Sequence, residues 1–304
     1  MKRVIIFIAS LLFAKEPIIP IPNSISYDRE KAYIGKLLFF DPILSKDRTV
    51  SCVSCHDFEY GGADPRAVSI GVEGKKGDIN SPTVYNAVFN SSLFWNGRAK
   101  DLYEQLDGPL LNPVEMAMDR NTIEQRLNAS PLYKKLFLKV YKKSFITYEM
   151  VKDALVEFEK ALITPNSKFD RYLQGKTELS PKEKEGYLLF KKLGCITCHN
   201  GINIGGNSYQ KIGSVIPYDG KIIHDRSEVT GKKEDRGLYR VAPLRNIALT
   251  APYFHDASAK TLQEAVSKIA YHNLGFSLNK QEIEKIVAFL HTLTGEKPEI
   301  LDEN

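Results

Sequence analysis

Two five-residue stretches, CVSCH at residues 52–56 and CITCH at residues 195–199, decide the organisation of the sequence. All four cysteines of the chain lie in them, and each has the pattern C-x-x-C-H. Two thiols at this spacing can add to the two vinyl groups of one haem, and the next histidine then lies under the iron. The sequence therefore predicts two covalently bound c-type haems, held by Cys52, Cys55, His56, Cys195, Cys198 and His199.

The same cysteines could instead form two local disulfides, a thioredoxin-like redox site or one four-cysteine zinc site. None of these needs a histidine directly after both pairs. The two pairs also lie in different halves of the chain, much farther apart than in a zinc ribbon. Haem attachment accounts for all six residues, with His56 and His199 as proximal iron ligands.

Length, charge and the first residues limit the class of protein. The chain has 304 residues, enough for about two domains. Its net charge of +5 is spread over 42 basic and 37 acidic side chains without a run of like charge, which argues against a nucleic acid partner. Lys2 and Arg3 precede an apolar stretch at 4–13 that is too short to span a bilayer. This pattern indicates a signal peptide at residues 1–14, or an uncleaved anchor, and a periplasmic location.

The sequence around the two C-x-x-C-H stretches repeats. A helical pattern precedes each of them, with GKLLF at 35–39 and GYLLF at 186–190. The repeat predicts a mainly α fold with two tandem cytochrome c-like domains, each around one covalently bound haem. We expect the domains at residues 24–165 and 166–304.

Local signals predict where several helices begin. A capping box pairs an N-cap Ser, Thr or Asn with a Glu three residues later, as at 180–183, 261–264 and 279–282. Thr147 opens another amphipathic stretch, and residues 99–106 favour a helix that carries Gln105. Residues 57–82 and 200–252 are rich in Gly, Asn and Pro, so we expect long irregular loops there and little sheet.

The sequence resembles the bacterial di-haem cytochrome c peroxidase family over most of its length. The resemblance rests on short words in the family's order: FFDP at 39–42, GGAD at 61–64, SPTVYN at 81–86, FWNGRA at 94–99, PVEM at 113–116, PLRNIALTAPYFH at 243–255 and FLHTLTGE at 289–296. One such word would be weak evidence, but their shared order is specific. The resemblance implies an enzyme that reduces hydrogen peroxide to water with electrons from a reduced small cytochrome c.

The resemblance also implies roles for the haems and for individual residues. The first haem would reduce peroxide, and the second would accept electrons from the donor. Glu115 matches the family's catalytic acid/base and Gln105 the amide that accompanies it. Trp95 matches a residue between the haems that helps electrons to cross. From the residues alone, Glu115 would be interpreted as a surface carboxylate and Trp95 as a core aromatic.

A calcium ion and a second subunit are further expectations from the family. Asn80, Thr250 and Pro252 match a calcium site at the interface between the domains, made of hard oxygen ligands. The expected cofactors are therefore two haem c groups and one calcium ion. Family members are often homodimers, and the same is expected here.

Two positions depart from the family's pattern. Many members have a haem-ligating histidine in the loop after the first haem, where this chain has Val72. The second haem usually has a distal methionine, where this chain has Ile269. His272, three residues on and on the same helix face, is the candidate replacement. The alternative is a surface His272 and an iron that is five-coordinate or bound by water.

Two other functions stay open at this stage. One is a di-haem enzyme that oxidises residues of a partner protein, as the methylamine dehydrogenase maturation enzyme does, although that enzyme has tyrosine where this chain has Ile269. The other is an electron-transfer cytochrome without catalysis. Glu115 and Gln105 argue against a carrier, because a carrier needs no proton shuttle.

Valine cannot ligate iron, so the first haem is predicted to have an open sixth position and to be active without prior reduction. The electron paramagnetic resonance and optical spectra of the fully oxidised protein at neutral pH check this, and a high-spin first haem is expected. Two six-coordinate low-spin haems would contradict it.

Overall fold

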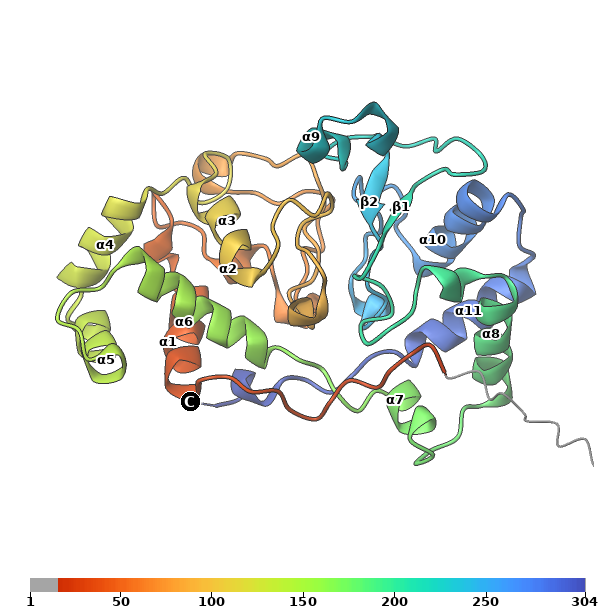
Figure 1. Cartoon of the computed structure of the whole chain (residues 1–304), viewed down its shortest axis with the longest axis horizontal. Coiled ribbons are helices and arrows are strands. Elements are labelled where there is room, and N and C mark those ends of the chain that lie inside the picture. The colour runs from red at the N-terminus through yellow and green to blue at the C-terminus, as the bar shows by residue number, and fades with distance from the viewer. Residues whose placement is uncertain (1–15, 304) are drawn as a thin grey trace, which may run out of the picture.

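The computed structural model describes residues 16–303, so the expected signal peptide or anchor at residues 1–14 lies outside the described residues. The fold is mainly helical, as predicted (Figure 1). No helix in the described part is both long and apolar enough to cross a bilayer. In chain order the helices and strands are α1 (Arg29–Phe40), α2 (Leu102–Gln105), α3 (Asp107–Leu111), α4 (Arg120–Ala129), α5 (Pro131–Tyr141), α6 (Tyr148–Ala161), α7 (Lys168–Leu173), α8 (Pro181–Lys192), β1 (Tyr209–Lys211), α9 (Ser227–Thr230), β2 (Leu238–Arg240), α10 (Leu262–Ile269) and α11 (Lys280–His291).

The predicted helix starts are confirmed where local signals are strong. Capping boxes open α8, α10 and α11, and the Thr147 side chain accepts a hydrogen bond from the backbone of Met150 at the start of α6. The helix predicted at 99–106 is wrong in length, because only α2 forms. Ala99 is held in a bridge with Leu93, and the Asp101 side chain caps the helix after it.

The sheet content is small, as predicted, and the long loops are mostly irregular. Within residues 16–303, β1 and β2 form one antiparallel pair with Tyr209 opposite Arg240. The loop at 57–82 contains only short 3-10 turns and isolated bridges. Turns and side-chain contacts therefore hold the loop at 57–82 in place.

A close crossing of two helices repeats in each half of the molecule. Helix α1 crosses α6 in the first half, and α8 crosses α11 in the second. A Cβ added to Gly35 would lie 2.0 Å from Ala154 O, and one added to Gly186 would lie 1.9 Å from the carbonyl oxygen of Lys285. Glycine at these two positions lets each pair of backbones touch.

Each crossing carries an aromatic pair directed toward the neighbouring C-x-x-C-H turn. The rings of Phe39 and Phe158 lie 5.2 Å apart between centroids, and those of Phe190 and Phe289 lie at the same distance. Phe39 and Phe190 in turn face the histidines, at 6.4 Å from His56 and 6.3 Å from His199. The repeat seen in the sequence is therefore a repeat of packing, with a large hydrophobic cluster in each half.

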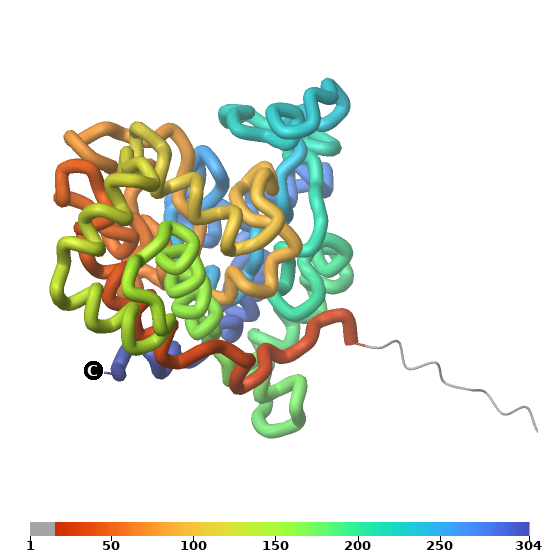
Figure 2. The backbone as a smooth tube through the Cα atoms, turned by 60° about the vertical axis from the view of Figure 1, so that its left-hand side comes forward, coloured from red at the N-terminus to blue at the C-terminus, as the bar shows by residue number. Residues whose placement is uncertain are grey.

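The two ends of the described chain cross to the opposite half (Figures 1 and 2). Residues 16–22 run along the second half, where Arg245 Nη2 donates to Ile19 O at 2.9 Å. The C-terminal 3-10 turn lies beside α1, with Ile300 in the first cluster and Lys36 Nζ donating to its carbonyl at 2.8 Å. Both ends therefore help to hold the halves together.

Two equivalent asparagines meet where the halves join. Asn86 Oδ1 accepts from Thr164 N at 2.9 Å, and Asn246 Oδ1 accepts from Gly295 N at 3.0 Å. Both side-chain amides also donate to Thr164 Oγ1, at 2.7 and 2.9 Å. Both buried amides are satisfied, and the bond from Asn246 to Thr164 crosses from the second half to the first, which helps to fix how the two halves meet.

Substitution of Gly35 by alanine tests the helix crossing. The added Cβ forces α1 and α6 apart, so Gly35→Ala is predicted to lower the free energy of unfolding by about 1–3 kcal/mol. Urea unfolding followed by circular dichroism measures the change. Gly77→Ala is the matched control, because a Cβ there meets its nearest atom at 3.6 Å. Equal stability of the two variants would contradict the role of Gly35.

Candidate active site

Both cysteine pairs are folded into the same tight turn. Residues Cys52–Ser54 form a 3-10 turn in which the backbone N–H groups of Cys55 and His56 both donate to Cys52 O, at 3.1 and 3.0 Å. The second motif repeats these two bonds to Cys195 O, at 3.2 and 2.9 Å. Among residues 16–303 no three His, Cys, Asp or Glu side chains gather in a metal-binding arrangement. The four-cysteine zinc site is therefore not formed within these residues.

The histidines that follow the two cysteine pairs each direct Nδ1 toward a backbone carbonyl oxygen. His56 Nδ1 lies 3.3 Å from Gly62 O, and His199 Nδ1 lies 3.3 Å from Ile204 O. A carbonyl only accepts, so Nδ1 carries the hydrogen and Nε2 keeps its lone pair. Burial lowers the pKa of both rings, that of His199 to about 4. Both imidazoles are therefore neutral and keep Nε2 free, which is what an iron ligand requires.

The second cysteine pair opens into a cavity of about 270 Å³. Cys195, Cys198 and His199 form part of its wall, and most of the remainder is apolar: Phe190, Leu193, Leu244, Val266, Ile286 and Leu290 are examples. A mostly apolar cavity with two thiols and one imidazole nitrogen at its edge suits a porphyrin. The residues present thus fit a c-type haem.

Glu115 lies in a tight turn after α3, and Asn112 holds it there. Asn112 Nδ2 donates to Glu115 Oε1 at 2.6 Å, while Asn112 Oδ1 accepts from Val114 N at 2.9 Å. Burial raises the pKa of Glu115, and the hydrogen bond from Asn112 partly opposes that rise. The carboxyl group is therefore half-buried, oriented and easier to protonate than an ordinary glutamate.

The loop that contains Val72 packs directly against this turn. Val72 N donates to Glu115 O at 2.9 Å, and the Val72 side chain is fully buried. A Cβ on Gly71 would lie 2.0 Å from Val114 O, so only glycine allows this approach. Glu115 is thus fixed from both sides, by Asn112 and by the loop.

Arg98 supplies positive charge beside the same turn. Its guanidinium lies over the ring of Phe94, 3.3 Å from the ring centroid. The charge of Arg98 lowers the pKa of Glu115, against the larger effect of burial. Gln105, at the end of α2, is half-buried and lies two residues before α3.

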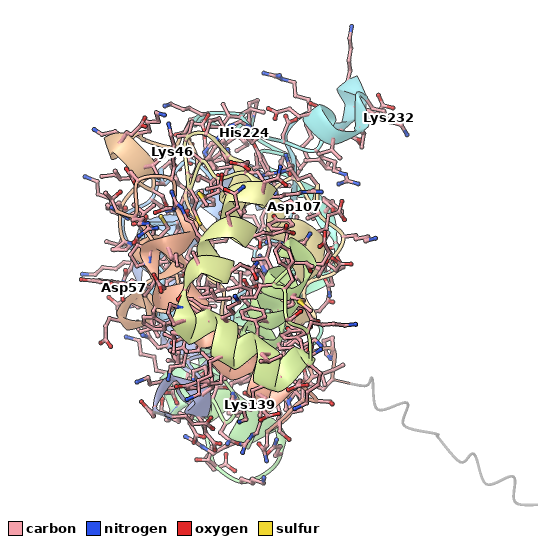
Figure 3. The ribbon with its side chains drawn as sticks, turned by 90° about the vertical axis from the view of Figure 1, so that its left-hand side faces the viewer. Lys46, Asp57, Asp107, Lys139, His224 and Lys232 are labelled. Carbon is pink, nitrogen blue, oxygen red and sulfur yellow. The ribbon has the colours of Figure 1, made fainter. Side chains whose placement is uncertain are left out.

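An ion-pair contact joins the two halves near the Val72 loop. His224 Nε2 lies 2.8 Å from Asp78 Oδ2, and its Nδ1 lies 3.1 Å from Glu228 Oε2. Partial burial opposes charging of the ring, but the two carboxylates outweigh it and raise the pKa of His224. His224 lies in the upper part of the view in Figure 3.

Comparison with known proteins identifies the family. A family model described as di-haem cytochrome c peroxidase matches residues 29–178. The cytochrome c551 peroxidase of Nitrosomonas europaea is 46% identical, over 96% of this chain and 88% of that protein. The chain belongs to the di-haem cytochrome c peroxidase family. The cytochrome c551 peroxidase of Pseudomonas aeruginosa is 42% identical, over 92% of this chain and 85% of that protein.

The fold of this chain is similar to that of a solved structure. A MauG-like protein associated with microbial copper homeostasis is 30% identical and has a TM-score of 0.81, covering 92% of this chain and 93% of that chain. Three relatives named as cytochrome c peroxidases are 42–46% identical. The chain is therefore a di-haem peroxidase, and its expected membership of this family is confirmed.

The tryptophan that the peroxidase family places between the haems lies where the halves meet. Trp95 Nε1 donates to Asn80 O at 2.8 Å, and its ring meets that of His255 edge to face at 6.1 Å between centroids. His255 is buried, stacked on Tyr239 at 4.1 Å. Trp95 also lines the cavity of the second cysteine pair, so it touches the second site directly.

The residues matched to the family's calcium site come together. Asn80, Thr250 and Pro252 all lie in the wall of the same cavity, next to Trp95. Asn80 is buried, and its Nδ2 donates to Arg66 O at 3.2 Å, which leaves Oδ1 as the atom it can offer to a cation. Occupation by calcium stays a prediction.

His272 is buried, but its ring nitrogens face other protein atoms. It lies in the π-helical turn Ala270–Leu274, with Nδ1 at 3.2 Å from Ile216 O and Nε2 at 3.3 Å from Asp219 Oδ1. The cavity wall at this turn includes Ile269 and Asn273. The distal role of His272 stays a prediction, and it requires one of the two ring nitrogens to leave its contact.

Three buried or partly buried polar residues were not predicted from the sequence. Asn112 directly precedes the PVEM motif that contains Glu115, so its position in the sequence could have indicated it. Nothing in the sequence pattern singles out Arg240 or Glu159. Glu159 is buried on α6, and burial raises its pKa to about 8. Arg240 lines the second cavity. Both are visible only once the helices and strands are packed.

Proposed function

We propose that Glu115 is the acid/base of peroxide reduction beside a haem bound by Cys52, Cys55 and His56. The haem supplies the redox centre at which the O–O bond breaks. Glu115 takes a proton from the near oxygen of hydrogen peroxide and returns it to the far oxygen, so that the far oxygen leaves as water rather than hydroxide. Two electrons and two further protons complete the reduction of one peroxide to two waters.

The half-buried, oriented carboxyl group is the observation that carries this proposal. Asn112 fixes Oε1 of Glu115, and burial raises the pKa of this carboxyl group, so that it is protonated more easily than an ordinary glutamate. The positive charge of Arg98 stabilises the negative charge that develops when the O–O bond breaks. Gln105 accompanies Glu115 and orients the peroxide.

The electrons enter through the second haem, bound by Cys195, Cys198 and His199 and reduced by a small cytochrome c. Trp95, which contacts His255 of the other half and lines the second cavity, helps electrons to cross between the sites. Calcium held by Asn80, Thr250 and Pro252 keeps the junction of the halves rigid, and His272 is the candidate distal ligand of the second iron.

The remaining expectations belong to the same proposal. Val72 cannot ligate iron, so a haem bound at the first site would have its sixth position open. The chain divides into domains at 24–165 and 166–304, is exported to the periplasm and forms a homodimer. The mainly apolar cavity and the two matching C-x-x-C-H turns support c-type attachment of both haems.

Removal of the carboxylate tests the proposed catalytic role. Glu115→Gln keeps the shape but cannot shuttle a proton, so kcat/KM for peroxide with a reduced small cytochrome c is predicted to fall about 10²–10⁴-fold. Steady-state assays measure this. Glu149→Gln, an exposed change on α6, is the control. Unchanged turnover in Glu115→Gln would reject the acid/base role.

The pH profile tests the same carboxylate independently. Glu115 acts first as a base, so the rate of reaction with peroxide falls as the pH drops through its pKa. In Asn112→Ala the donor that stabilises the carboxylate is lost, the pKa rises further, and the acid limb moves to higher pH. Stopped-flow measurement from acid to neutral pH shows the limb. An acid limb that stays in place, or that is also present in Glu115→Gln, contradicts the assignment.

A further inference from the structure

Arg240 is a buried cation that lacks a partner for part of its guanidinium. It is the last residue of β2, and its side chain is 3% exposed. Its backbone N donates to Trp95 O at 2.8 Å and its Nε to Phe94 O at 3.2 Å. Nη1 is buried and has no hydrogen-bond partner. The strand therefore fixes the arginine while leaving one end of the guanidinium free.

Burying a guanidinium without a negatively charged partner costs free energy. Another buried arginine of this chain has such a partner. Arg245, also almost wholly buried, pairs with Asp170 at 2.6 Å. Among residues 16–303 no carboxylate does this for Arg240, and burial lowers its pKa to about 10. Buried charges in native proteins are paired, so a missing anion is indicated.

The position of Arg240 indicates which anion that is. Its side chain lines the cavity that also contains Cys195, Cys198 and His199. A haem in this cavity brings two propionate carboxylates, which are the natural partners of a planar guanidinium. We propose that Arg240 binds a propionate of the second haem, an inference that rests on the proposed attachment of that haem to Cys195 and Cys198.

This contact links the second haem to the first site. The same arginine is bonded to the carbonyls of Phe94 and Trp95, and Phe94 carries Arg98 on its ring. Arg240 therefore fixes the second haem against the segment that leads to Glu115. Its positive charge also favours the ferrous state, because reduction adds a negative charge at the neighbouring haem.

Spectroelectrochemical titration of the complete two-haem protein tests the proposal. Arg240→Gln is expected to lower the midpoint potential of the second haem more than that of the first, and Arg240→Lys, which keeps the charge, is expected to lower it less. Arg236→Gln, an exposed residue of the same segment with the same change in charge, is the control. A second-haem potential in Arg240→Gln equal to that in Arg236→Gln would overturn the proposal.

Two further measurements keep the result unambiguous. Haem content of the wild-type protein is measured first, because a chain without the second haem refutes its attachment rather than the role of Arg240. A crystal structure of the haem-loaded protein then decides directly, even if Arg240→Gln does not mature. Nη1 or Nη2 is expected within hydrogen-bond distance of a propionate oxygen, and a guanidinium that meets only protein atoms or water would refute the contact.

Discussion

The hydrogen bond from each imidazole Nδ1 to a backbone carbonyl is the interaction on which the rest of the molecule depends. It commits the ring hydrogen of His56 to Gly62 O and that of His199 to Ile204 O, so that Nε2 is left for an iron. Both carbonyls belong to residues with positive φ, +71° at Gly62 and +51° at Ile204. For a β-branched residue such a conformation costs about 1–3 kcal/mol, and tight packing around the fully buried Ile204 maintains it.

One scaffold is used twice for different chemistry. The helix crossings at Gly35 and Gly186, the two cysteine turns and the asparagines at the junction are equivalent in the two halves. The equivalent bridges Leu93–Ala99 and Tyr253–Ala259 enclose Trp95 and His255, whose rings meet. The difference lies in what surrounds each haem site. The first half places a carboxyl group, an amide and an arginine together, whereas the second is mostly apolar and offers an unpartnered guanidinium.

Features encoded in a few consecutive residues could be predicted from the sequence, and those created by packing could not. The cysteine turns and the capping boxes at 180–183, 261–264 and 279–282 depend on neighbours in the chain. The helix at 99–106 was predicted too long because the bridge at Ala99 is a contact with another part of the loop. Arg240 was missed because its partners, Phe94 and Trp95, lie in the other half of the sequence. Glu115 was identified only by family resemblance, since its burial and its bond to Asn112 are properties of the folded turn.

The most direct test of this account is the intact mass of the purified, matured protein together with its visible spectrum. The account predicts a mass greater than that of the polypeptide by two haems, a Soret band, and the loss of one haem's mass when either Cys52 and Cys55 or Cys195 and Cys198 are replaced by serine. A matured chain that weighs no more than its amino acids and has no Soret band would contradict it.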